Sequence, residues 1–136
     1  MFAVLKFARK PMAWLALSLL PLAACGPMPG GGGVTPGKPV PVGLLVPGGS
    51  GNASDEVLAL NLRQAAEMAA TDLDGAAVDL RVYNTGANPA GAASAAQRAV
   101  AEGAQIILGP VYAESANGAG KAVASSGVNV LAFSNV

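Results

Sequence analysis

The segment Val42-Gly-Leu-Leu-Val46, followed by the turn Pro47-Gly-Gly-Ser-Gly-Asn-Ala-Ser54, decides the fold of this chain. Its five apolar residues form the short continuous run that is typical of a strand covered on both faces. Residues 55–73 then predict a helix, because Ser54 can cap it and two acidic residues, 55 and 56, suit the positive end of its dipole. Its predicted apolar stripe consists of Leu58, Leu62, Ala65, Ala69 and Leu73.

The same alternation of strand and helix continues towards the C-terminus. Residues 78–83 predict a half-exposed edge strand, in which Val78, Leu80 and Val82 alternate with polar neighbours and with Tyr83. Further helices are predicted over residues 90–102 and 114–126, and further strands over residues 105–108 and 128–133. This β-α-β-α-β-α-β pattern predicts an α/β fold with a parallel, doubly wound sheet and helices on both faces.

Composition excludes several classes of function. The chain of 136 residues has eight Lys and Arg residues, eight Asp and Glu residues, and no histidine. A Ser-His-Asp mechanism and a metal site of the His/Cys type are therefore excluded. Basic residues are few and scattered, so we expect no nucleic-acid partner. No pair of acidic residues is convincingly catalytic, and we expect a binding protein without enzymatic activity, cofactor or metal.

The N-terminus has the pattern of an export signal. Lys6, Arg9 and Lys10 precede an apolar run over residues 12–22, which is too short to span a bilayer as a helix. Leu22-Ala-Ala-Cys25 follows and resembles the lipobox of bacterial lipoproteins. We therefore expect a signal peptide over residues 1–24 and lipidation at Cys25. The resemblance implies anchoring on the periplasmic side of a membrane, and Gly26 favours the outer over the inner membrane.

A flexible Gly/Pro linker is expected between the anchor and the folded part, over residues 25–41, with the domain itself covering residues 42–136. In doubly wound sheets, ligands bind beyond the carboxyl ends of the strands, where the strand order reverses. This rule brings residues 47–54, 109–115 and 133–136 around one crevice. The candidate ligand-binding residues there are Ser50, Tyr112, Ser115, Ser134 and Asn135.

Some of these residues have a second interpretation. Ser115 suits a helix cap equally well, and Tyr112 could simply cover the edge of the core. The turn around Ser50 could also bind a ligand anion through free N–H groups at the start of the helix.

Five segments occur in an order that resembles the first lobe of the type I periplasmic binding fold, the leucine-binding protein family. They are residues 42–47, 61–69, 82–89, 103–112 and 127–135. The resemblance runs from about Val40 to the last residue, and it implies the strand order 2-1-3-4. Family members are more than twice as long and have a second lobe, so the resemblance implies that this domain is truncated. Its fourth strand is then expected at an exposed edge.

The resemblance leaves two functions open. One branch of this superfamily binds amino acids or similar solutes and presents them to an ABC permease. Another consists of lipoproteins that activate a peptidoglycan synthase, a penicillin-binding protein, by direct contact. Gly109-Pro-Val-Tyr112 and Ala132-Phe-Ser-Asn135 resemble the activators. Amino-acid receptors usually have small hydroxyl residues where Tyr112-Ala-Glu114 stands, which disfavours amino-acid binding, but solute binding is the commoner use of the fold.

Overall fold

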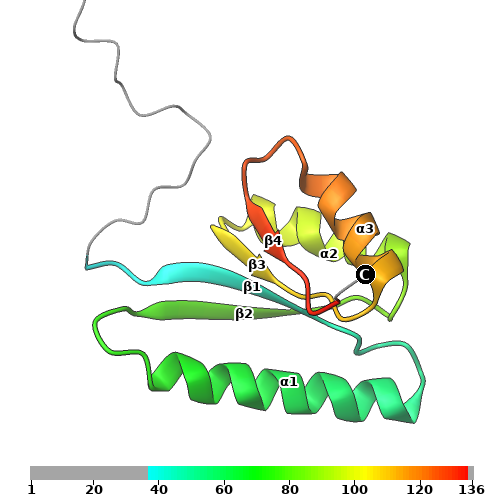
Figure 1. Ribbon diagram of the computed structural model, residues 1–136, viewed down its shortest axis with the longest axis horizontal. Helices are drawn as coiled ribbons and strands as arrows, with labels where there is room; N and C mark the ends of the chain where they lie inside the picture. Colours follow the sequence, from blue (N-terminus) through cyan, green and yellow to red (C-terminus); the bar gives the residue numbers. More distant parts are fainter. Residues whose placement is uncertain (1–36, 135–136) are drawn as a thin grey trace, which may run out of the picture.

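The computed structural model describes residues 37–134, which form one layered α/β unit (Figure 1). Within this range, four parallel strands form a single sheet in the order β2-β1-β3-β4, which confirms the predicted fold class and strand order. The elements in chain order are β1 (Val40–Val46), α1 (Ala53–Thr71), β2 (Val78–Asn84), α2 (Pro89–Ala101), β3 (Ile106–Leu108), α3 (Ala113–Val123) and β4 (Asn129–Leu131).

Helices α2 and α3 cover one face of the sheet, and the core beneath them is built from small residues (Figure 1). Leu45 of β1 and Ile107 of β3 are fully buried against this pair of helices. The helices approach closely because they present glycine and alanine to each other and to the sheet. The fully buried alanines on this face are Ala92, Ala95, Ala96, Ala99 and Ala119.

Helix α1 lies alone on the opposite face and packs against β1 and β2. Its buried contact is Ala59 with Leu44 and Val46. The predicted apolar stripe was therefore partly wrong, since Ala65, Ala69 and Leu73 are exposed. The physical reason is that α1 does not reach over β3 and β4, so its flank borders an apolar groove that also contains Leu108 and Leu131.

The limits of several elements differ from the prediction. Strand β1 begins at Val40, two residues early, and α1 is capped by Asn52 instead of Ser54. The Asn52 side-chain oxygen accepts a hydrogen bond from the Ser54 N–H at 2.8 Å, so the helix starts earlier than predicted. Helix α3 ends at Val123 because the Ser126 hydroxyl donates to the Val123 carbonyl and closes the last turn.

Strand β2 is an edge strand, as predicted, but its polar face is not wholly exposed. Tyr83 is 7% exposed and packs with the alanines of α2. Its hydroxyl donates to the Glu102 carboxylate at 2.7 Å, which provides the polar partner that a buried tyrosine needs. Val82, on the opposite face, is more exposed because α1 covers it only in part.

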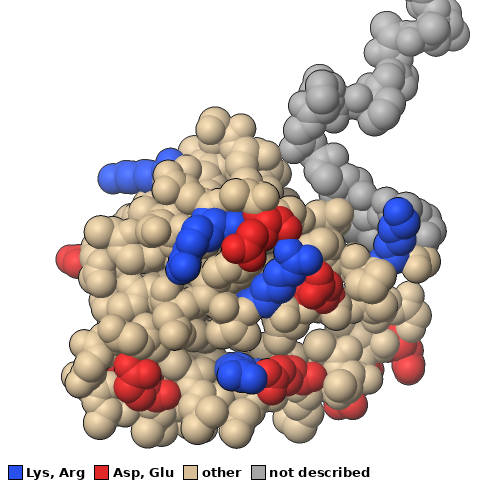
Figure 2. All heavy atoms as spheres, turned by 180° about the vertical axis from the view of Figure 1, so that it is seen from behind, with Lys and Arg blue, Asp and Glu red and all other residues tan. Residues whose placement is uncertain are grey.

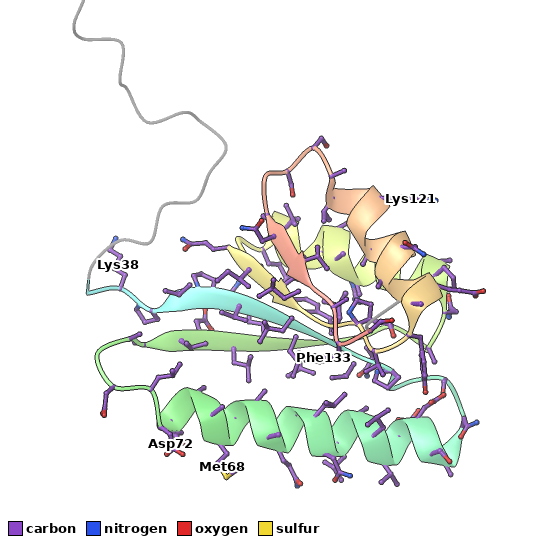
Figure 3. The ribbon with its side chains drawn as sticks, in the orientation of Figure 1. Lys38, Met68, Asp72, Lys121 and Phe133 are labelled. Carbon is purple, nitrogen blue, oxygen red and sulfur yellow. The ribbon has the colours of Figure 1, made fainter. Side chains whose placement is uncertain are left out.

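No helix within residues 37–134 is both long and apolar enough to cross a membrane. Figure 3 shows Lys38 at the amino-terminal edge of the sheet and Phe133 at the carboxyl-terminal edge. The start of the described chain and the candidate crevice therefore lie at opposite edges.

Candidate functional site

The carboxyl ends of the four strands lie at one edge of the sheet, where the connecting loops gather (Figure 1). The chain leaves β1 towards α1 on one face, whereas it leaves the neighbouring β3 towards α3 on the other face. This divergence between adjacent strands is the switch point at which doubly wound folds bind ligands. The crevice predicted from the sequence therefore has the required topology.

The loop after β1 is closed by its own hydrogen bonds. The Gly49 N–H donates to Glu56 Oε1 at 2.7 Å, and the Asn52 N–H donates to the Ser50 hydroxyl at 3.1 Å. Gly49 and Gly51 both have positive φ, which lets the chain turn this tightly. Because these N–H groups and that of Ser54 already have partners, fewer donors remain at the α1 N-terminus for a ligand anion.

The loop after β3 is held against its neighbours by the backbone. Gly109 has a φ of 85°, and a Cβ atom there would lie 2.4 Å from the Leu45 carbonyl oxygen. The Gly109 N–H donates to the Leu131 carbonyl at 2.8 Å, and the Phe133 N–H donates to the Pro110 carbonyl at 3.0 Å. The ends of β1, β3 and β4 are thereby joined into one rigid floor beneath the loops.

One carboxylate bridges the two sides of the crevice. The Tyr112 hydroxyl, at the start of α3, donates to Asp55 Oδ1 at 2.5 Å, and the Ser50 hydroxyl donates to Asp55 Oδ2 at 2.8 Å. The hydrogen bond to Asp55 raises the pKa of Tyr112 above its ordinary value, because the bond stabilises the protonated phenol. Ser50 and Tyr112, two predicted ligand residues 62 positions apart in the sequence, are therefore connected through Asp55.

The structure places the remaining predicted residues differently. Ser134 is half-buried in the loop after β4. Ser115 is 1% exposed on the inner face of α3, in line with Ala119 and Val123, and its hydroxyl has no hydrogen-bond partner among the described residues. It is not the helix cap, which is Tyr112. Asn135 and Cys25 lie outside the described residues.

Sequence reasoning missed the structural roles of Asp55 and Glu56. The sequence indicates only that both acids suit the positive end of the helix dipole, yet Asp55 binds two crevice hydroxyls and Glu56 binds the turn after β1. The contact between Ser50 and Asp55 had a local signal in the sequence, since the two residues flank the start of the helix at a spacing that allows a hydrogen bond. The first turns of α1 and α3 contain Asp55, Glu56 and Glu114, so the described charged groups beside these loops are acidic.

The fold and the crevice define an α/β binding lobe of the type I periplasmic binding fold. A family model described as periplasmic binding protein matches residues 39–136, and the chain belongs to this family. Searches of curated proteins and of solved structures found no match. Membership assigns the chain a general role in solute binding in the periplasm, within a family that is typically not catalytic.

Proposed function

We propose that this protein is a lipid-anchored receptor that binds a small solute, such as an amino acid, and presents it to an ABC permease on the periplasmic side of a bacterial membrane. The observation that carries the proposal is the bridge from Ser50 through Asp55 to Tyr112 across the switch point. It arranges two hydroxyl oxygens and a carboxylate at the position where the fold binds ligands.

The proposed anchor is the lipidated Cys25, with the outer membrane favoured over the inner by Gly26. Its position agrees with the fold, because β1 begins at the edge of the sheet opposite the crevice (Figure 1). A tether attached before β1 leaves the crevice loops free to meet a solute or a partner. The linker over residues 25–41 would lose only its last two residues to β1.

Within this proposal, the five predicted ligand residues have unequal access. Ser50 and Ser134 are half-buried and Tyr112 is 40% exposed, so these residues can contact a ligand at the surface of the crevice. Asn135 directly follows Ser134 in the chain and is proposed with it. Ser115 would contribute only if α3 shifted, since its hydroxyl is enclosed.

A second candidate function is activation of a penicillin-binding protein by surface contact. It is favoured by the same hydrogen bonds, because the hydroxyls of Ser50 and Tyr112 already donate to Asp55 and cannot also donate to a ligand carboxylate. Glu114 beside them would further repel such a carboxylate. On this alternative the crevice is internally satisfied, and the outer surface of the domain makes the functional contact.

Thermal-shift titration of the full chain in mild detergent against a panel of amino acids separates the two functions. A specific ligand at a hundred times its dissociation constant should stabilise the fold by about 2.7 kcal/mol. Tyr112→Ala should abolish this shift, whereas Lys121→Ala, far from the crevice on the last turn of α3, should leave it unchanged. A well-folded chain that responds to no amino acid would favour the activator, to be tested by binding to a peptidoglycan synthase.

A further inference from the structure

A hollow lies at the outer edge of the sheet, between the first half of α1 and the edge strand β2, and it borders the loop after β1 at Gly48 and Glu56. It has a volume of about 300 Å³. The apolar residues Val46, Ala59, Leu60 and Val82 line its floor, and the polar groups around them contribute more of the accessible lining than these side chains do. Seen from the β2 side in Figure 2, charged side chains gather in one band along α1 and in another across the body above it. The hollow lies between α1 and that body.

Two of the apolar side chains in this hollow are open to solvent. Leu60 is 53% exposed and Val82 is 37% exposed, and they approach the same space from α1 and from β2. Single exposed aliphatic residues are common on protein surfaces. Two that converge on a concave site beside polar groups instead resemble the lining of small-ligand pockets.

The backbone of β2 supplies hydrogen-bonding groups beside this floor. The Val40 N–H donates to the Ala77 carbonyl, and the Thr85 N–H donates to the Val46 carbonyl, so odd-numbered residues of this segment face β1. Backbone direction alternates along a strand, and Val82 and Asn84 therefore turn their N–H and C=O groups outward. Within residues 37–134 no strand pairs with that edge. Such an edge is a template for an added extended chain.

Two opposite charges bound the hollow along α1. Glu56 and Arg63 are seven residues apart, which corresponds to about 10 Å along a helix axis. Glu56 uses Oε1 to accept from the Gly49 N–H, and Arg63 uses Nε to donate to Glu67 at 2.7 Å. One carboxylate oxygen and the terminal guanidinium nitrogens are not engaged in these bonds. An extended tripeptide also spans about 10 Å between its charged ends.

We propose that this hollow binds a short extended peptide of about three residues with free ends. Its ammonium group meets Glu56 and its carboxylate meets Arg63, so it runs antiparallel to β2 and pairs with the outward groups of Val82 and Asn84. The first and third side chains, opposite Asn84 and Val82, point towards the α1 face, where they meet the floor of the hollow and are aliphatic. This site does not depend on a ligand in the crevice.

The test uses the isotopically labelled full chain in detergent, titrated with leucyl-alanyl-leucine and followed by the backbone amide signals of Val82 and Asn84. We expect saturable shifts at both amides. Acetylation of the peptide's amino group or amidation of its carboxylate should each weaken binding by about tenfold or more, since each removes a charge-assisted hydrogen bond. Free leucine should bind at least about tenfold more weakly than the tripeptide, because it lacks the paired backbone.

Three variants locate the site. Arg63→Ala should weaken binding of the free tripeptide by about tenfold. It should also remove the difference in affinity between the free and the amidated peptide. Arg81→Ala is the matched control, because Arg81 also pairs with a nearby acid, Asp79, but lies outside the hollow. Gly48→Ala should also weaken binding, since the added Cβ would lie 2.6 Å from Asn84 Oδ1 and push the side-chain amide of Asn84 out of place.

The proposal would be overturned by equal losses in Arg63→Ala and Arg81→Ala, by shifts confined to the crevice loops, or by leucine binding as tightly as the tripeptide. The last outcome would identify a single amino acid as the ligand and remove the role of the β2 edge. Tyr112→Ala separates the two sites, because it changes the crevice and leaves the hollow intact.

Discussion

The two faces of the sheet are closed by different means. On the α2 and α3 face, alanine and glycine allow backbones to approach so closely that few larger side chains are needed. On the α1 face, two large aliphatic residues stay open to solvent: Leu131 of β4 is 55% exposed, and Leu73, just beyond the end of α1, is 51% exposed. Small residues allow α2 and α3 to close the core on their face of the sheet. The larger residues of the α1 face are covered only where α1 reaches.

The largest expected effects come from truncating two neighbouring leucines of β1 that point to opposite faces. Leu45 is buried beneath α2 and α3, and Leu44 is buried beneath α1. Leu45→Ala should cost about 4 kcal/mol of unfolding free energy, and Leu44→Ala only about 2 kcal/mol, because the looser face can collapse into the space left. Urea denaturation of the full chain measures both, and equal costs would show that the faces are equally well packed.

A smaller effect is expected from a pair of glycines on α3. A Cβ at Gly118 would lie 2.4 Å from the Pro89 carbonyl oxygen on α2, whereas one at Gly120 would have nothing within 4 Å. Gly118→Ala should therefore destabilise by about 2 kcal/mol through overpacking. Gly120→Ala should stabilise by up to about 1 kcal/mol through helix propensity. If Gly118→Ala also stabilised the fold, the close approach of α2 and α3 would not matter.

These glycines also show what the sequence could and could not predict. Apolar runs and turn residues predicted each strand and helix that the structure describes within residues 37–134, because those signals are local, whereas the strand order came from the family resemblance. Glycine disfavours a helix interior, yet α3 runs through Gly118 and Gly120. The reason for Gly118 lies on another helix, and no local pattern reveals it.

The candidate site was predictable in place but not in detail. The switch-point rule identified the loops that contain Ser50 and Tyr112. It could not identify Asp55 as their common partner, since Asp55 and Tyr112 are far apart in the sequence. Nor could it show that Ser115 points inward, because a serine in the first turn of a helix suits a cap, a ligand or a packed interface equally well.

The smallest expected effect concerns the outer edge of the α2 and α3 face, which Tyr83 closes. Burial, followed by the hydrogen bond to Glu102, raises the pKa of Tyr83 above its ordinary value of 10.0. The folded protein thus retains this proton at a pH where the unfolded chain has lost it. The resulting stability is complete below pH 10.0 and is lost as the pH rises through the folded-state pKa.

Tyr83→Phe should remove this dependence while keeping the aromatic ring packed on the alanines. At neutral pH the variant should be less stable by about 1 kcal/mol, because the bond to Glu102 is lost. The difference from the unmodified protein should shrink as the pH rises above about 10. Urea denaturation of both proteins across this range isolates Tyr83, since Tyr112 titrates in both. A constant difference would mean that the hydroxyl does not help to close this edge, and that the small residues of α2 do so alone.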